Sequence, residues 1–156
     1  FTEFPPGTKR SKALPSIETY FAELAKSLIA QGFEVVLLGG EQEDHRNKNI
    51  PAASSAKYLG YFSLSQFINL IDQCDLIVTQ VTMGMHLTLG LQKKIVLMNN
   101  IFNPNEFDLF GKGEIVMPDK ACECFYRGSC KLGASCMKDL APAKVLNAVN
   151  RVLEIK

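Results

Sequence analysis

The sequence predicts an α/β protein with a doubly wound, mostly parallel sheet. Short apolar runs alternate with longer stretches in which apolar residues recur at helical spacing. Three of these runs have no polar face, which is typical of strands buried on both sides of a parallel sheet. They are residues 33–38 (FEVVLL), 76–78 (LIV) and 95–98 (IVLM).

Composition bounds the class of protein. The chain has 156 residues, 47% of them hydrophobic and 21% charged, so we expect residues 1–156 to form one globular domain. A formal net charge of +1 argues against a nucleic-acid partner. No apolar run approaches the ~18–20 residues that a transmembrane segment needs, and no secretory signal pattern is present. Because the chain begins at Phe1, we expect it to belong to a longer protein and to lack an N-terminal part.

The first half of the chain gives two strand–helix patterns. Residues 1–4 read as a strand that Pro5-Pro6-Gly7 ends, and after a basic loop Pro15 and Ser16 suit a helix start. The apolar stripe of that helix is Ile17, Tyr20, Phe21, Leu24, Ala25, Leu28 and Ile29. Gln31-Gly32 ends it, and the strand of residues 33–38 follows as a central parallel strand.

Weaker patterns fill residues 41–75. Residues 41–55 are polar and contain Pro51, so we expect a surface loop, and residues 57–60 indicate a short strand. Ser63 is a good N-cap for a helix. The apolar stripe of that helix is Leu64, Phe67, Ile68 and Ile71.

The second half contains the most informative stretch, residues 75–90 (DLIVTQVTMGMHLTLG). A buried strand breaks at residues 79–82, and a second apolar pattern then surrounds His86, which predicts a strand, a turn and a helix. Residues 95–98 and 114–117 indicate two further strands. Pro142 opens a last helix whose apolar face is Val145, Leu146, Val149, Val152 and Leu153.

Ligands of parallel sheets bind at the carboxyl ends of the strands, so the loops after residues 4, 38, 78 and 98 should share one edge. A helix that starts there offers free N–H groups and a positive dipole end to phosphates. We therefore predict a nucleotide-linked ligand at this edge. The candidate residues are Thr8, Lys12, Gly40, Glu41, Thr82, His86, Asn99 and Asn100.

Plainer interpretations exist for several of these residues. His86 has apolar neighbours, so a structural histidine fits as well as a ligand contact. Lys12 fits a solvated loop lysine, and the pair Gly39-Gly40 is not a dinucleotide-binding fingerprint.

Four of the five cysteines lie in one C-x-C-x5-C-x5-C segment: Cys122, Cys124, Cys130 and Cys136. Three interpretations stay open, namely a tetrahedral zinc site, two disulfides and unbridged thiols. Cys74 stands apart beside an apolar run and fits a small core residue.

The order and spacing of several motifs resemble family 9 glycosyltransferases, the ADP-heptose:lipopolysaccharide heptosyltransferase group. These motifs are PPGT…KALP, FAELAKSLIAQGFEVVLLGG, LGYFSLSQFINLIDQCDLIVT, TMGMHLTLGLQKKIVLM, NPNEFDLFG and the cysteine segment ending in SCM. Together they cover nearly the whole chain.

The resemblance implies a GT-B enzyme in which this chain is the C-terminal, Rossmann-like half and binds a nucleotide-diphosphate sugar. A glycolipid or glycan acceptor, and the general base, would belong to the N-terminal domain. Transfer would need no cofactor, and the protein would be cytoplasmic or peripheral on the inner face of the membrane. The donor-binding residues implied are Thr8 and Lys12 on the diphosphate side, Gly40 and Glu41 on the nucleoside side, and Thr82, Met83, Gly84 and His86 at the turn.

The turn before the helix around His86 departs twice from the family pattern D-[ST]-G-x-x-H. Val81 stands in place of the Asp and Met83 in place of the Gly, although Gly84 follows at once. Loss of the carboxylate removes a hydrogen-bond acceptor beside the donor sugar. Two hypotheses follow: a glycosyltransferase donor domain, or a degenerate nucleotide-binding or interaction domain with the same fold. A third treats the cysteine segment as a zinc module for a macromolecular partner.

Overall fold

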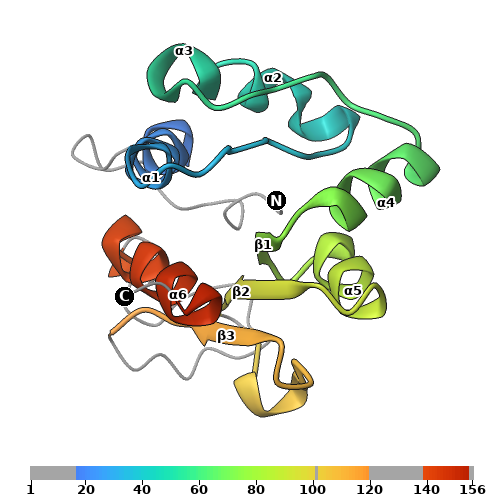
Figure 1. The fold of residues 1–156 in the computed structure, drawn as a ribbon, viewed down its shortest axis with the longest axis vertical. Coiled ribbons are helices and arrows are strands. Elements are labelled where there is room, and N and C mark those ends of the chain that lie inside the picture. Colours follow the sequence, from blue (N-terminus) through green and yellow to red (C-terminus); the bar gives the residue numbers. More distant parts are fainter. Residues whose placement is uncertain (1–16, 101, 120–138, 155–156) are drawn as a thin grey trace, which may run out of the picture. The chain divides into compact units, whose positions relative to one another are not determined.

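The computed structural model describes residues 17–100, 102–119 and 139–154. They divide into two compact units, one of residues up to 73 and one from residue 74 onward (Figure 1). Each unit is described by itself.

The second unit contains a parallel sheet of three strands. They are β1 (Leu76–Gln80), β2 (Lys94–Met98) and β3 (Gly113–Val116), in the order β1-β2-β3. Helix α5 (Met83–Gly90) supplies the crossover from β1 to β2 that a parallel pair requires. Gln80 lies opposite Met98, so β1 and β2 end at the same edge, as the sequence predicts.

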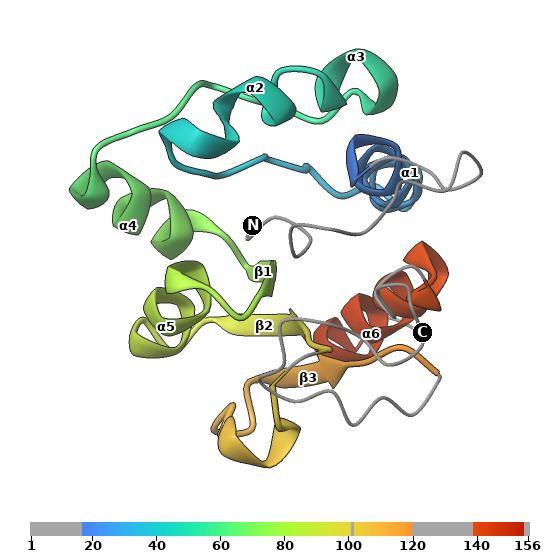
Figure 2. The same ribbon diagram turned by 180° about the vertical axis from the view of Figure 1, so that it is seen from behind.

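Helices cover both faces of this sheet, as Figures 1 and 2 show for α5 and α6 (Pro142–Leu153). Ile95 and Leu97 of β2 pack with Met85 of α5 and with Leu109. Because side chains alternate along a strand, Val96 and Met98 of β2 face the other side. Helix α6 packs against β2 and β3 with Val145, Ala148 and Val149 buried.

Polar contacts fasten the end of α6 to the sheet. Lys94 Nζ donates to the carbonyl oxygen of Val152 at 3.0 Å, where the last carbonyls of a helix need donors. Arg151 donates to both carboxylate oxygens of Glu114, at 2.9 and 2.6 Å. This pairing lowers the pKa of Glu114.

The first unit is built around α1 (Ile17–Ala30), which packs against α3 (Ile50–Ser54). Leu24, Ala25 and Leu28 are buried on the face that the sequence predicts, and Ala22, which lies outside the predicted stripe, is buried too. Gly32 ends the helix with φ +90°, a conformation that glycine adopts without strain.

The predicted strand of residues 33–38 and the predicted short strand of residues 57–60 form only a single parallel bridge, between Val36 and Lys57. Leu37 N–H donates to Lys57 O and Lys57 N–H donates to Val35 O, both at 2.8 Å. Because pairing in this unit stops after one residue, the apolar run is half-buried rather than a central strand.

The prediction of a loop at residues 41–55 is wrong. It contains the 3-10 turn η1 (Glu41–Glu43) and the short helices α2 (Asp44–Asn47) and α3. Asp44 accepts hydrogen bonds from Lys48 Nζ at 2.5 Å and Tyr58 Oη at 2.7 Å. Burial and this bond to Asp44 raise the pKa of Tyr58 to about 12. The bond within the segment and the bond from Tyr58, which lies beyond it, hold together residues whose own pattern is polar.

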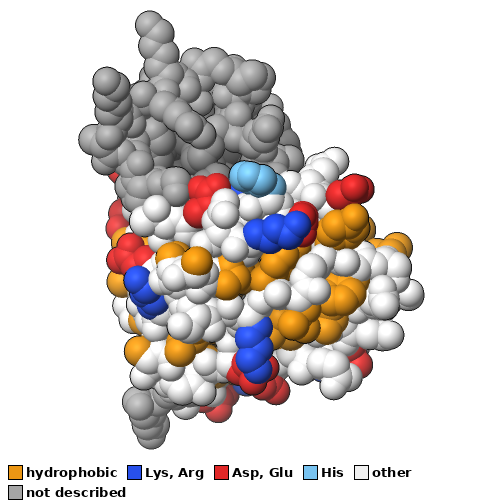
Figure 3. Space-filling view, turned by 90° about the horizontal axis from the view of Figure 1, so that it is seen from above, with side chains coloured by type: hydrophobic (Ala, Val, Ile, Leu, Met, Phe, Trp, Pro, Cys, Tyr) orange, Lys and Arg blue, Asp and Glu red, His pale blue; other side chains and the backbone are white. Residues whose placement is uncertain are grey.

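Helix α4 (Leu64–Gln73) begins after Ser63, as predicted, and Ile71 on its stripe is buried. Leu64 is not part of the packed face, because it is 56% exposed. Leu59 and Tyr61 just before it are exposed too. On the face that Figure 3 shows, hydrophobic side chains reach the surface in several places, among Lys, Arg, Asp and Glu side chains.

The long connection from β2 to β3 carries the 3-10 turn η2 (Pro104–Glu106), where Asn103 accepts from Asn105 N–H. The predicted strand of residues 1–4 lies outside the described residues. No helix in the described part of the chain is long and apolar enough to cross a membrane.

Candidate functional site

The turn from β1 into α5 is the centre of the candidate site. Thr82 is the N-cap, with extended backbone (φ −144°, ψ 179°), and its carbonyl accepts from Met85 N–H at 3.0 Å. Its side chain makes no capping hydrogen bond. The first N–H groups of a helix have no partner within the helix, so this turn presents donors and a positive dipole end.

The helical period of α5 decides which of its residues face the core and which face solvent. Met85 is 2% exposed and packs into the core, whereas Met83 is 57% exposed. His86 is exposed and, three residues after Met83, lies on the same side of the helix. The structure therefore places His86 at the surface near the helix start, not in the core.

Two hydroxyl groups and a glycine line the inside of the turn. Thr79 Oγ1 lies 3.3 Å from Thr82 Oγ1 and 3.2 Å from the carbonyl oxygen of Gln80. A methyl group on Gly84 would lie 3.4 Å from Thr82 Oγ1 and 3.5 Å from Thr79 Oγ1. The missing side chain of Gly84 thus leaves space beside both hydroxyls. Sequence reasoning missed Thr79, which precedes the motif; a hydroxyl at the end of a buried strand is the signal that could have shown it.

Val81 does not merely replace a polar group. It is half-buried and packs against the cluster of Met85, Ile95, Leu97 and Leu109. The residue at this position is therefore part of the apolar support of the turn.

Asn99 is another predicted ligand at this sheet edge, but its side chain makes hydrogen bonds within the loop after β2. It is 1% exposed, its Nδ2 donates to Phe102 O at 2.7 Å, and its Oδ1 accepts from Phe102 N–H at 3.2 Å. Asn99 therefore shapes the loop after β2 and is not available to a ligand, contrary to the prediction.

Gly40 and Glu41 belong to the first unit. Gly40 N–H donates to Glu43 Oε2 at 2.9 Å, and both Gly40 and Glu41 are exposed. A side chain on Gly39 would lie 2.8 Å from Asn47 Nδ2 and from Glu43 Cβ, so this position requires glycine. The carboxylate of Glu41 is thus displayed at the start of η1 by a tightly packed turn.

Asn100 follows β2 and is half-buried. The other remaining predicted ligands lie outside the described residues. These are Thr8, Lys12, Cys122, Cys124, Cys130 and Cys136. Within residues 17–100, 102–119 and 139–154, no group of three or more His, Cys, Asp and Glu side chains could hold a metal ion. Cys74 is half-buried rather than a core residue, and burial raises the pKa of its thiol.

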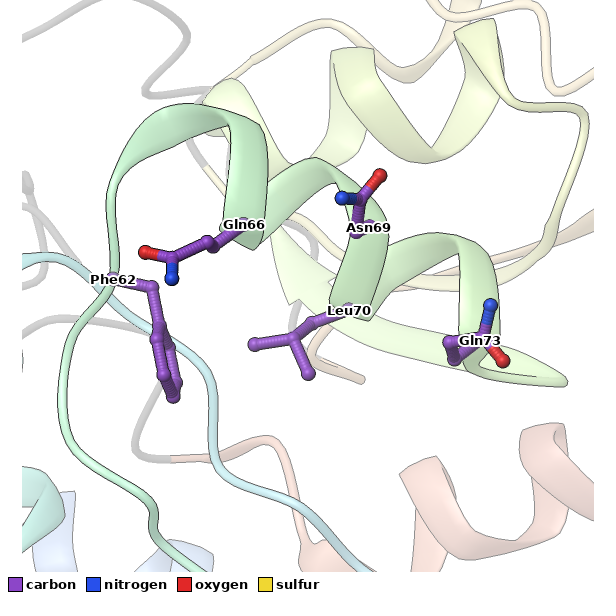
Figure 4. Close-up of a pocket in the computed structure, with 5 residues that line it drawn as sticks. All are labelled: Phe62, Gln66, Asn69, Leu70 and Gln73. Carbon is purple, nitrogen blue, oxygen red and sulfur yellow. The ribbon is translucent and has the colours of Figure 1, made fainter.

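A shallow depression runs along α4 in the first unit (Figure 4). Its lining combines an aromatic ring, an aliphatic side chain and three amides: Phe62, Gln66, Asn69, Leu70 and Gln73. None of these side chains titrates, and none is a predicted site residue.

The comparison with family models identifies the chain. The model of glycosyltransferase family 9 (heptosyltransferase) matches residues 3–122, which is more than half of the chain. The chain belongs to glycosyltransferase family 9, and the predicted resemblance is confirmed.

Two curated relatives agree with this assignment. Lipopolysaccharide heptosyltransferase 2 of Escherichia coli is 27% identical over 159 residues, covering 96% of this chain and 46% of the relative. Lipopolysaccharide heptosyltransferase 2 of Salmonella typhimurium is 30% identical over 109 residues, covering 65% and 31%. The chain thus spans less than half the length of these relatives.

Solved structures show the same fold. The E. coli ADP-heptose LPS heptosyltransferase II matches with a TM-score of 0.69 and 26% identity, covering 96% of this chain and 45% of that one. A glycosyl transferase family 9 protein from Veillonella parvula also gives 0.69, at 16% identity, covering 94% and 45%. The predicted α/β, Rossmann-like fold, one half of a GT-B fold, is confirmed.

Proposed function

We propose that this chain binds the nucleotide-diphosphate sugar donor in a glycosyl transfer reaction. The single observation that carries the proposal is the turn at Thr82, where an open helix start, two hydroxyls and a glycine lie together at the carboxyl end of β1. Family membership supplies the reaction class, glycosyl transfer. The sugar that we propose is a heptose or hexose, and the acceptor a lipopolysaccharide or surface glycan.

The proposed chemistry is electrostatic. Cleavage of the bond between sugar and diphosphate leaves negative charge on the departing diphosphate, and the helix start of α5 stabilises that charge. The Thr82 hydroxyl donates to a phosphate oxygen, and the exposed His86 donates from its ring. Lys12 adds a positive charge and Thr8 a hydroxyl, while Gly40 and Glu41 contact the nucleoside. No metal is needed for this step, and the general base and the acceptor site lie in another part of the protein.

Two neighbouring structures contain a nucleotide of this kind. Heptosyltransferase WaaC of E. coli is described with ADP and with ADP-2-deoxy-2-fluoro heptose, at TM-scores of 0.64 and 0.58. At 19% and 22% identity these likenesses show the fold alone, so the nucleotide is an inference from the family.

Calorimetric titration of the purified chain with ADP, UDP, GDP and adenosine tests the proposal. We expect one of the diphosphates to bind, and to bind more tightly than adenosine. A folded sample that binds none of the three diphosphates would refute the proposal.

A second candidate function is a degenerate domain that keeps the fold and binds a nucleotide or a protein without transfer. Its support is Val81, which is integrated into the apolar cluster where the family pattern has an acid. An assay of sugar transfer by the full-length protein separates the two candidates. Release of the diphosphate together with a glycosylated acceptor supports the transferase; nucleotide binding without turnover supports the degenerate domain.

A further inference from the structure

We propose that Thr79 is a positioning residue that aims the hydroxyl of Thr82 at an anionic ligand. The inference rests on the proposed function, and the anion is the diphosphate of the nucleotide sugar. Thr79 does not contact the ligand in this scheme; it acts through Thr82.

The geometry gives Thr79 two neighbours of different kinds. Its Oγ1 lies 3.2 Å from the carbonyl oxygen of Gln80, which can only accept, and 3.3 Å from Thr82 Oγ1, which can donate or accept. Both threonines are half-buried, so these contacts compete less with water than they would at the surface.

Counting protons shows how the pair responds to an anion. Each hydroxyl carries one proton and can also accept. When Thr79 donates to Gln80 O, Thr82 can donate to Thr79, and the proton of Thr82 is used inside the turn. When Thr79 donates to Thr82 instead, the proton of Thr82 is free to point outward. A phosphate oxygen beside Thr82 favours this second arrangement, because it accepts the outward proton in a charge-assisted hydrogen bond.

The second arrangement is a chain of donors that runs from Thr79 through Thr82 to the anion. Each hydrogen bond in such a chain polarises the next, so the bond to the phosphate gains strength from Thr79. Gly84 leaves open the space beside both hydroxyls, since a methyl group there would lie 3.4 Å from Thr82 Oγ1.

The test compares Thr79→Val, which keeps the shape of the side chain, with Thr79→Ser, which keeps the hydroxyl. Thr88→Val is the matched control, because Thr88 Oγ1 donates to Gly84 O at 2.6 Å within α5 and takes no part in the hydroxyl pair. Affinities of the full chain and its variants for ADP and for adenosine are measured by calorimetry, and stability by urea unfolding.

We expect Thr79→Val to lower the affinity for ADP about fivefold, the size expected for one ordinary hydrogen bond, and to leave the affinity for adenosine unchanged. Thr79→Ser should restore ADP affinity, and Thr88→Val should change stability without a selective loss of ADP. If Thr79 had only a structural role, Thr79→Val would lower the affinities for ADP and for adenosine together.

The outcomes separate this inference from the proposed function. If the unmodified chain binds ADP no better than adenosine, the proposed function fails and this inference with it. If the unmodified chain prefers ADP but Thr79→Val binds ADP equally well or more tightly, only the role of Thr79 is overturned. An equal loss in Thr79→Ser and Thr79→Val overturns it too.

Discussion

Replacing Gly84 with Ala should stabilise the fold and weaken nucleotide binding. Gly84 is the second residue of α5, and Gly-to-Ala in a helix contributes up to about 1 kcal/mol of stability. The added methyl group meets Thr82 Oγ1 at 3.4 Å and Thr79 Oγ1 at 3.5 Å, which are ordinary contacts that the turn accommodates. The same methyl group fills the space beside the hydroxyls that a phosphate would need.

We therefore expect Gly84→Ala to raise the free energy of unfolding by about 0.5–1 kcal/mol. We expect the affinity for a nucleoside diphosphate to fall about tenfold, which corresponds to about 1.4 kcal/mol. Urea unfolding measures the first quantity and calorimetric titration the second. A gain in stability together with a loss of affinity is informative, because a variant that binds poorly through misfolding would lose both stability and affinity.

Gly90→Ala is the matched control. Gly90 ends the same helix, and a methyl group there would have no neighbour within 4 Å. It should leave nucleotide affinity unchanged. If Gly84→Ala binds the nucleotide as tightly as the unmodified chain, the phosphate does not lie beside these hydroxyls.

Three further substitutions test the structure around the site. Val81→Asp should lower the free energy of unfolding by about 2–4 kcal/mol at neutral pH, because it places a carboxylate against apolar side chains. Urea unfolding should show this loss shrinking as the pH falls and the carboxyl is protonated, and a loss independent of pH would contradict the prediction. Gly113→Ala should lower the free energy of unfolding by about 3 kcal/mol, because its methyl group would overlap the carbonyl group of Ile95 across the sheet. An unchanged urea midpoint would show that β3 can shift. Because Arg151 lowers the pKa of Glu114, this carboxylate stabilises the fold above the ordinary glutamate pKa, and that stability is lost as the pH falls through the folded-state pKa. In thermal melts Glu114→Gln should therefore lose less stability at acid pH than the unmodified chain does, and an identical pH profile would exclude the contribution.

Strong periodic patterns gave the reliable part of the sequence-based prediction. Residues 95–98 have no polar face and form β2, and the stripe after Pro142 forms α6, because burial on the expected face outweighs local preferences. The strand, turn and helix around Thr82 followed from the same reasoning.

Other features depend on contacts that the local sequence does not reveal. The helices within residues 41–55 are ordered by Tyr58 and by packing against α1, so their own polar composition predicted a loop. Asn99 looked like a ligand-binding amide because nothing in its neighbourhood shows that Phe102 will occupy both ends of it. The role of Val81 as apolar support is visible only from residues far along the chain.

The most direct test of the account is to locate the nucleotide on the chain by NMR. Backbone amide shifts are recorded while ADP, and separately adenosine, is added to the isotopically labelled protein. We expect the amides of Met83 and Gly84, in the first turn of α5, to shift strongly with ADP and little with adenosine. Shifts confined to residues far from this turn, such as those of α6, would contradict the claim that it holds the diphosphate.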